Sequence, residues 1–238
     1  MRDALPEELA GLRSPVVVVA HPDDESFGLG AVVASLVDGG ASVAQICLTR
    51  GEASTLGVTR ASTGADPTAP LASRRANELE RAAAALGIGP IVTAAHADGH
   101  LAEVDPDALV SEVVHHAMRL GADGFVVFDS DGITGHPDHR AATRAALGAA
   151  AHLDVPVVAW TVPTSVAETL NAELGTGFVG RADDEVDVRL RVDRTRQLEA
   201  IACHRSQSGD NAVLWRRLEL MGETEALRWL RRPPAAAS

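Results

Sequence analysis

The sequence predicts an α/β fold: a Rossmann-like, mostly parallel sheet with helices on both faces, forming a single domain over residues 1–238. Short β-branched runs, each bounded by turn residues, alternate with helical patterns from one end of the chain to the other. Apolar runs this short are typical of buried parallel strands. Their alternation with helices is typical of a doubly wound sheet. A length of 238 residues suits one compact domain.

The first half of the chain predicts three strands and two helices. In chain order, they are the strand Pro15–Val19, the helix Ser26–Val37, the strand Ser42–Leu48, the helix Leu71–Leu86 and the strand Ile91–Ala94. The strands are rich in β-branched residues, which favour a pleated and buried position. Glycines follow both helical patterns, as expected where a helix ends.

The second half continues the alternation. Asp105 places a capping carboxylate before Pro106, which predicts a helix from there to about Leu120. Apolar and charged residues alternate in the run before residue 193, which predicts a more exposed strand. The other expected elements are strands at 124–128, 156–161 and 186–192, and helices at 195–203 and 212–230.

Two stretches lack a regular pattern and are expected to be loops, 53–70 and 163–184. Long irregular loops inside a compact domain often form binding rims or lids. Residues 231–238 contain Pro233-Pro234 and several alanines, which predicts a frayed tail.

The composition excludes several classes of protein. A net charge of -12 disfavours binding to nucleic acid or to an anionic membrane. The two cysteines, Cys47 and Cys203, lack the spacing of a disulfide framework or a cysteine-rich zinc site, which favours a reducing compartment. The sequence shows neither a secretory signal nor an apolar run of membrane-spanning length. We therefore expect a cytoplasmic protein.

A cluster of polar residues follows the first expected strand. Ala20-His21-Pro22-Asp23-Asp24-Glu25 offers one imidazole and three carboxylates. In open parallel sheets, ligands bind at the carboxyl ends of the strands, where this segment is expected to lie. Imidazole nitrogen and carboxylate oxygen are good ligands for Zn²⁺. His21 and Asp24 are three residues apart across a turn, so their side chains can converge, while Asp23 points differently.

A second cluster follows the fourth expected strand and so emerges at the same edge. Gly135-His136-Pro137-Asp138-His139-Arg140 adds two imidazoles at three-residue spacing. Together the two clusters can supply three protein ligands and leave one coordination position open, which is typical of a catalytic zinc site. We expect one Zn²⁺ per chain, with Asp138 orienting an imidazole from behind.

These residue types predict hydrolysis by activated water. Zinc lowers the pKa of bound water to about 7, which makes a nucleophile available at neutral pH. We expect His21, Asp24 and His139 to bind the metal. Asp23 is expected to be the general base that takes a proton from water and later delivers it to a leaving amine. His136 is expected to donate to the oxyanion of the tetrahedral intermediate.

Each cluster also has a purely structural interpretation. Asp23 or Asp24 could cap a helix after a strand-to-helix turn, and His136 to His139 could be a capped helix start with incidental histidines. Two such clusters at the ends of two strands of one sheet favour the metal site over this coincidence.

Both clusters resemble motifs of the PIG-L/LmbE family of zinc-dependent N-acetylglucosaminyl deacetylases, and the resemblance covers nearly the whole chain. Further segments that match the family are Arg75-Ala76-Asn77-Glu78-Leu79 followed by Leu86-Gly87, then Asp98-Gly99-His100-Leu101, and His204-Arg205-Ser206-Gln207.

The resemblance implies the same roles as the chemistry does. It places the zinc ligands at His21, Asp24 and His139, the base at Asp23, and an assisting imidazole at His136. It also implies that Arg75 and Asp98 contact the sugar of the substrate.

Other residues have ordinary structural interpretations. Arg75 and Glu78 belong to a pattern of charges at helical spacing that, without the family, would indicate a solvated helix face. His204 lies where a helix is expected to end, so it can complement the helix dipole. Trp215 and Trp229 lie at helical spacing and are expected in the core.

The favoured function is removal of an N-acetyl group from an N-acetylglucosamine-type amino sugar or glycoconjugate. One alternative is an amidase that acts on a larger conjugate with the same zinc chemistry. Another is a metallo-phosphoesterase, for which Asp129 and Asp131 are the only obvious extra carboxylates. A non-catalytic sugar- or nucleotide-binding module lacks a Gly-rich phosphate loop in its favour. The expected partner is a small-molecule amino sugar, with no nucleic acid and no membrane; a homo-oligomer stays open.

Overall fold

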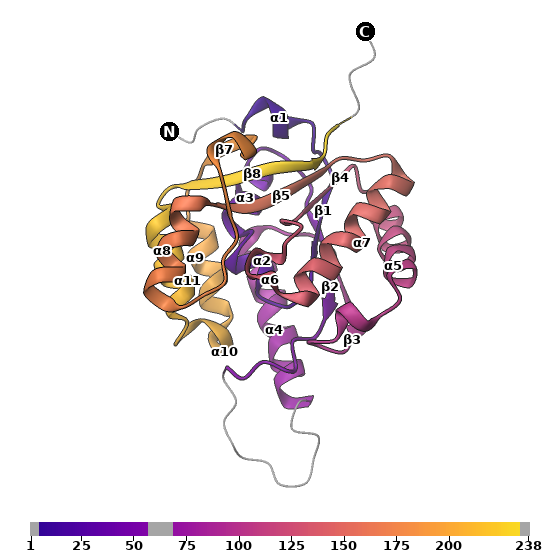
Figure 1. The fold of residues 1–238 in the computed structure, drawn as a ribbon. Helices are drawn as coiled ribbons and strands as arrows, with labels where there is room; N and C mark the ends of the chain where they lie inside the picture. The colour runs from indigo at the N-terminus through magenta and orange to yellow at the C-terminus, as the bar shows by residue number, and fades with distance from the viewer. Residues whose placement is uncertain (1–4, 57–68, 234–238) are drawn as a thin grey trace.

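The computed structural model describes residues 5–56 and 69–233, and within them it forms a twisted sheet between two layers of helices (Figure 1). The strands are β1 Pro15–Val19, β2 Ala44–Thr49, β3 Ile91–His96, β4 Gly124–Phe128, β5 Val157–Pro163, β6 Gly180–Arg181, β7 Val188–Arg191 and β8 Thr224–Arg231. The α-helices are α1 Glu7–Ala10, α2 Asp24–Phe27, α3 Gly30–Asp38, α4 Ala69–Leu86, α5 Pro106–Leu120, α6 Gly132–Gly135, α7 Pro137–Leu153, α8 Thr164–Leu174, α9 Thr195–Cys203, α10 Arg205–Ser208 and α11 Ala212–Met221. Two 3₁₀ turns cover Leu101–Glu103 and Asp183–Glu185.

The order of the strands explains why both polar clusters meet. The order is β3-β2-β1-β4-β5-β8-β7, and β6 pairs with β5. Strand β1 pairs in parallel with β2 on one side and with β4 on the other, so that Val16 lies opposite both Ala44 and Phe125. Strands β2 and β3, which follow β1 along the chain, lie on one side of it, and β4 and β5 lie on the other side. The position between β1 and β4 is therefore a topological switch point, where open α/β sheets bind ligands.

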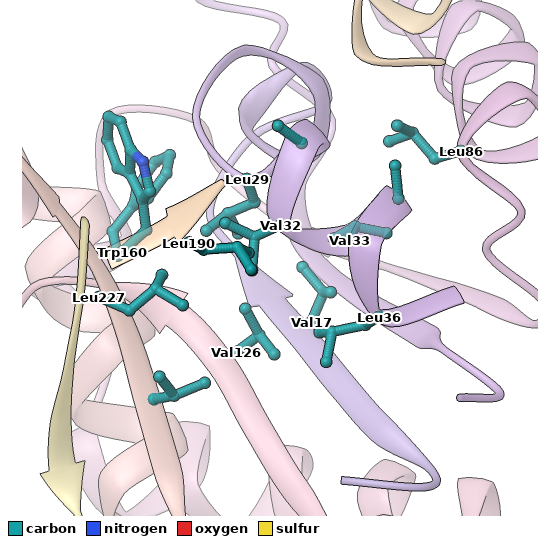
Figure 2. Close-up of a cluster of buried hydrophobic side chains, with 14 of the residues drawn as sticks. Val17, Leu29, Val32, Val33, Leu36, Leu86, Val126, Trp160, Leu190 and Leu227 are labelled. Atoms are coloured by element: carbon teal, nitrogen blue, oxygen red, sulfur yellow. The ribbon is translucent and has the colours of Figure 1, made fainter. Parts of the chain in front are cut away.

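Alternating residues of β1 build the two halves of the core. Val17 and Val19 point into a cluster with helices α3 and α4, which Figure 2 shows together with residues from β4, β5, β7 and β8. Val16 and Val18 point into the opposite cluster with α5 and α7. In Figure 1, α5 and α7 lie on one side of the sheet, and α8, α9 and α11 lie on the other. A strand buried on both faces therefore fixes the start of the first polar cluster.

The α/β class and the mostly parallel sheet are confirmed, but the expected helix 212–230 is wrong. Helix α11 ends at Met221, where Gly222 adopts a positive φ of 53°. The chain then forms β8, which pairs in an antiparallel manner with both β5 and β7. The helical relation of the two tryptophans is also wrong: Trp215 is 43% exposed on α11, whereas Trp229 lies on β8 and packs, partly buried, against the core.

Other corrections concern segments near the site. The expected helix 26–37 is split into α2 and α3 at Gly28 and Leu29. Gly28 packs so tightly on the Phe128 ring that a Cβ atom would overlap it. The stretch 163–184 is not irregular, since it contains α8 and β6. Of the stretch 53–70, residues 57–68 lie outside the described part of the chain.

The expected frayed tail 231–238 is wrong at its first residue. Arg231 is the last residue of β8 and donates a 2.7 Å hydrogen bond to the Val155 carbonyl. Residues 234–238 lie outside the described part. Among the helices of the described residues, none combines the length and the apolar character needed to cross a membrane.

Candidate metal and catalytic site

Three side chains converge at the carboxyl ends of β1 and β4. His21 lies in the turn after β1, Asp24 is the first residue of α2, and His139 lies in the first turn of α7, which comes after β4. His21 Nδ1 is 3.2 Å from His139 Nε2, and Asp24 Oδ1 is 3.2 Å from the same nitrogen. His21 Nδ1 is 3.6 Å from Asp24 Oδ2. The structure thus brings together all three residues that the sequence predicts as metal ligands.

The spacing of these atoms fits a metal ion. Tetrahedral bonds of about 2.0–2.1 Å place neighbouring ligand atoms about 3.3–3.4 Å apart. The three observed separations span 3.2–3.6 Å. Two imidazole nitrogens and a carboxylate are also a common donor set for first-row divalent metals. Among the described residues, His21, Asp24 and His139 therefore can hold an ion and leave a fourth position open.

The far nitrogen of each imidazole is held by an oxygen. His21 Nε2 lies 3.0 Å from Asp98 Oδ1 and 3.4 Å from Asp138 Oδ2. His139 Nδ1 lies 3.2 Å from the Gly132 carbonyl. Carboxylate and carbonyl oxygens only accept, so they suit protons on these far nitrogens when the near nitrogens hold a metal. Partners behind metal-bound histidines are commonly arranged in this way.

Asp138 lies where the sequence predicts a residue that orients an imidazole. It is fully buried and accepts backbone hydrogen bonds from Gly99 at 2.8 Å and from Leu101 at 3.0 Å. Burial raises the pKa of this carboxyl, but the contact with His21 and the backbone donors outweigh burial and hold the pKa below its ordinary value. Asp98, expected to contact sugar, places one oxygen 3.0 Å from His21 Nε2 and accepts at the other from the backbone of Ala53 at 2.9 Å.

Asp23 is free for chemistry because its side chain does not cap α2. Its backbone has a φ of 133°, a region that residues other than glycine rarely adopt. Its carboxylate lies 3.0 Å from Arg75 Nη2. Burial raises the pKa of the Asp23 carboxyl to about 6, against the opposing effect of Arg75.

The neighbouring carboxyl of Asp24 shifts in the opposite direction. Burial raises its pKa, but His139 and His21 outweigh burial and hold the pKa well below its ordinary value. Two adjacent carboxyls with opposite shifts commonly mark a proton-transferring group beside a permanently ionised one.

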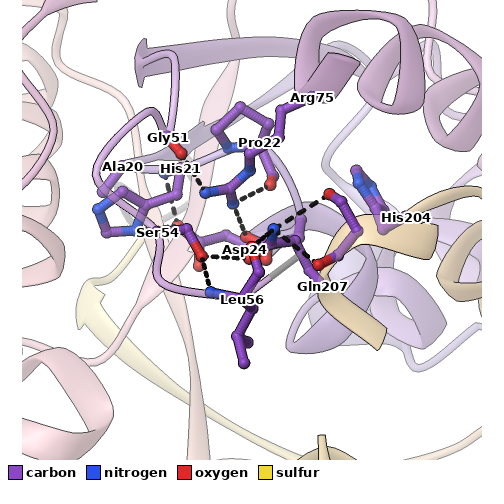
Figure 3. A network of polar contacts seen from close by, with 12 residues as sticks. Ala20, His21, Pro22, Asp24, Gly51, Ser54, Leu56, Arg75, His204 and Gln207 are labelled. Atoms are coloured by element: carbon purple, nitrogen blue, oxygen red, sulfur yellow. Dashed lines mark hydrogen bonds and ion pairs between the residues drawn. The ribbon is translucent and has the colours of Figure 1, made fainter. Parts of the chain in front are cut away.

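Arg75 is buried and links two loops, so it does not lie on a solvated helix face. It is 3% exposed, and α4 carries it into the space between two loops. Its guanidinium donates to the carbonyls of Gly51 at 2.6 Å and Pro22 at 2.5 Å, beside its ion pair with Asp23 (Figure 3). Gly51 has a φ of 65°, and any Cβ there would overlap the guanidinium. The solvated-face interpretation is therefore wrong for Arg75.

The late segment His204–Gln207 also belongs to the site. His204 Nε2 lies 2.7 Å from Glu25 Oε1, and both residues have 0% exposure. Ser206 donates from its hydroxyl to the buried Glu78 at 2.6 Å. Gln207 accepts at 2.6 Å from a serine in the loop after β2 (Figure 3). His204 does lie at the C-terminal cap of α9, but its side chain contacts the buried Glu25. Without the family resemblance the sequence held no signal for these contacts.

His136 combines the structural and the chemical interpretations. Its Nδ1 accepts the backbone N–H of Asp138 at 3.2 Å and so caps α7. An accepting Nδ1 places the proton of the neutral ring on Nε2. The ring stacks on His139 at 4.7 Å and meets His21 edge-on at 5.0 Å. Burial lowers the pKa of His136, and the two other imidazoles lower it further.

The carboxylates that a second metal ion would need are paired with an arginine. Asp129 accepts from Arg181 Nε at 2.8 Å, and Asp131 is paired with the same guanidinium. The other cluster of metal-binding groups in the described residues consists of His21, Asp98 and Asp138, so it shares His21 with the first. The arrangement offers one metal position with an open side.

Known proteins are similar to this chain in sequence and in fold. Residues 16–150 match the family model PIG-L, described as GlcNAc-PI de-N-acetylase. A 1D-myo-inositol 2-acetamido-2-deoxy-alpha-D-glucopyranoside deacetylase of Kineococcus radiotolerans is 30% identical over 169 residues, covering 58% of this chain and 46% of the relative. The chain thus spans about half the length of that relative. A probable N-acetyl-alpha-D-glucosaminyl L-malate deacetylase 2 of Bacillus anthracis is 27% identical over 222 residues and 93% of each chain.

Solved structures confirm the fold. GalB, the 4-carboxy-2-hydroxymuconate hydratase of Pseudomonas putida KT2440, superposes with a TM-score of 0.70 at 17% identity, over 95% of this chain and 99% of that chain. The N,N'-diacetylchitobiose deacetylase of Pyrococcus horikoshii gives a TM-score of 0.67 at 20% identity, over 95% of this chain and 87% of that chain. One fold thus carries a hydratase and a deacetylase, so the fold alone does not decide the reaction. The family match, which covers more than half of the chain, shows that this protein belongs to the PIG-L family of de-N-acetylases.

Proposed function

We propose that this protein is a zinc-dependent hydrolase that removes the N-acetyl group from an N-acetylglucosamine-type amino sugar or glycoconjugate. The observation that carries the proposal is the convergence of His21, Asp24 and His139 with the unligated carboxylate of Asp23 beside them. Membership of the PIG-L family supports the acetyl group and the sugar, because the relatives are named as deacetylases of N-acetylated glucosamine derivatives.

His21, Asp24 and His139 are the residues that would hold the zinc ion, one per chain. When bound there, zinc supplies Lewis-acid activation of water and of the acyl oxygen. The protein's own contribution begins with Asp23, whose carboxylate accepts a proton from water as the new C–O bond forms at the amide carbon. A pKa of about 6 suits a group that must both take and return a proton near neutral pH.

The second half of the reaction returns that proton. When the C–N bond breaks, the protonated Asp23 delivers it to the departing amine, so that water and amide become acetate and a free amine. His136 donates its Nε2 proton in a hydrogen bond to the acyl oxygen while negative charge develops there. Its lowered pKa favours the neutral ring, whose accepting Nδ1 leaves Nε2 as the donor.

The sugar contact expected of Arg75 and Asp98 remains a proposal. Both side chains already hold other parts of the site, since Arg75 contacts Asp23 and Asp98 contacts His21. A role in positioning these groups is therefore expected in addition to any contact with substrate.

Acetate release decides between the favoured function and its alternatives. The zinc-loaded protein is incubated with N-acetylglucosaminides that differ in aglycone, and acetate and free amine are quantified before and after chelation. We expect equal amounts of both products, loss on chelation, and recovery on adding one equivalent of zinc. Acetate only from large conjugates would favour the amidase, and two metal equivalents with phosphate-ester cleavage would favour the phosphoesterase. No acetate from any N-acetylated sugar would favour the binding module.

A further inference from the structure

The backbone of Asp23 is held in a strained conformation. Its φ of 133° and ψ of -23° lie outside the regions favoured for residues with a Cβ. Such a conformation is unfavourable and persists only where the surroundings enforce it. The groups that hold this backbone therefore decide where the Asp23 carboxylate points.

A buried carboxylate holds the nitrogen side of that residue. The backbone N–H of Asp23 donates to Glu25 Oε2 at 3.0 Å. On the other side, the Asp23 carbonyl accepts from the backbone of Ser26 at 3.0 Å and of Phe27 at 2.7 Å, which are ordinary bonds of a helix start. At the polar groups of the Asp23 backbone itself, the contact with Glu25 is thus the one that depends on a side chain, and Arg75 holds the Pro22 carbonyl of the same peptide.

Glu25 in turn depends on His204. Its Oε1 accepts from the Ser26 hydroxyl at 2.6 Å and faces His204 Nε2 at 2.7 Å. Ser26 is a near neighbour in sequence, whereas His204 is 179 residues away and lies between α9 and α10. A carboxylate with 0% exposure needs such donors, because burial without them is costly.

The side chain of His204 makes no other hydrogen bond in the described part of the chain. Its Nδ1 is buried without a hydrogen-bond partner. Its ring packs edge-on against Phe27, with centroids 5.8 Å apart. The polar role of this imidazole is therefore its contact with Glu25, which joins the late segment to the turn that carries Asp23.

We propose that His204 and Glu25 are positioning residues for the proton transfer: His204 fixes the Glu25 carboxylate, and Glu25 fixes the strained backbone of Asp23. The inference rests on the proposed function, because it takes Asp23 as the base. Neither residue is among the groups that would hold the metal, so the pair acts on the base and leaves metal binding intact.

The test separates the donor from the bulk of the imidazole. His204→Phe keeps an aromatic ring against Phe27 but removes the donor to Glu25. His204→Gln restores an N–H donor at a similar reach. We expect kcat to fall about 10- to 100-fold in His204→Phe, since small misplacements of a catalytic group cost that much. KM and zinc content stay at wild-type values, His204→Gln recovers most of the rate, and the control Glu199→Gln, at an exposed position of α9, changes nothing.

A double-mutant cycle shows whether the pair acts through Asp23. In an Asp23→Asn background, His204→Phe should cost no further activity, because the group it positions is already absent. If the two losses multiply, or if His204→Phe retains the wild-type kcat, the proposal is wrong. Lowered zinc content in His204→Phe would also contradict it.

A second variant covers the case in which His204→Phe fails to fold. Glu25→Gln cannot accept all the donors that surround the carboxylate, and we expect the same loss of kcat and the same lack of additivity with Asp23→Asn. Additive losses there contradict the proposal. Failure of the proposed function would look different, because the wild-type protein itself would then release no acetate.

Discussion

His21 and His139 face each other through opposite ring nitrogens, Nδ1 and Nε2, at 3.2 Å. The opposite nitrogen of each ring is held by protein oxygens: two carboxylates for His21, and the Gly132 carbonyl for His139. These contacts hold both rings with their near nitrogens toward the centre. The first prediction concerns these partners.

Replacing Asp98 by Asn should weaken zinc binding. The amide lacks the charge that stabilises the proton on His21 Nε2, and loss of such a partner typically lowers metal affinity about 10- to 100-fold. Competition with a chromophoric chelator measures the zinc Kd. Asp184→Asn, at an exposed carboxylate, serves as the matched control. An unchanged Kd with a raised KM would assign Asp98 to the sugar alone.

Replacing Arg75 by Met should destabilise the fold. The change leaves the Asp23 carboxylate and two loop carbonyls without their buried cation. Removing one partner of a buried pair costs about 3–5 kcal/mol, which urea unfolding of the zinc-loaded protein can measure. The exposed Arg81→Met is the control from the same helix. Wild-type stability combined with a raised KM would show that Arg75 acts on the substrate and does not stabilise the fold.

Removing the His136 imidazole should affect rate far more than metal content. We expect His136→Ala to lower kcat about 100- to 1,000-fold, as loss of one oxyanion donor does, while one zinc per chain remains. The same change removes the cap of α7 and should cost about 1 kcal/mol of stability. Metal analysis, steady-state kinetics and unfolding separate these effects. A His136→Ala variant with wild-type kcat would exclude the oxyanion role.

The His204–Glu25 pair should make stability depend on pH. Burial lowers the pKa of His204, but Glu25 outweighs burial, with help from Asp23 and Glu78, and the net pKa lies above its ordinary value. A raised folded-state pKa contributes stability that is full below the unfolded pKa, about 6.5, and is lost as pH rises through the folded value. The unfolding free energy of the wild type, minus that of His204→Gln, should shrink as pH rises from 6 to 9. A difference that grows with pH would contradict the shift.

Local chemistry made the centre of the site predictable from sequence. His21, Asp24 and His139 lie next to strands whose apolar runs end abruptly, so their edge of the sheet follows from pattern alone. Strands β1 and β4 fall where the sequence predicts them, because both are short, buried and bounded by turn residues. The same reasoning missed β8: a partly apolar run after a helix does not reveal by its period that it pairs between two other strands.

The supports of the site were not predictable in the same way. Arg75 and Glu78 have the spacing of a solvated helix face, and only the packing of α4 on the site loops buries them. The contact between His204 and Glu25 joins residues 179 positions apart, and no local pattern encodes it. The sequence alone does not reveal which charged groups become buried by tertiary contacts.

Asp23→Asn tests the central claim most directly, because the amide keeps the shape of the side chain but cannot take a proton. Zinc content and acetate release from an N-acetylglucosaminide are measured on the same preparation. The account predicts one zinc per chain and a rate about 100- to 10,000-fold below wild type, the range for loss of a general base. Acetate release at the wild-type rate by this variant would contradict it.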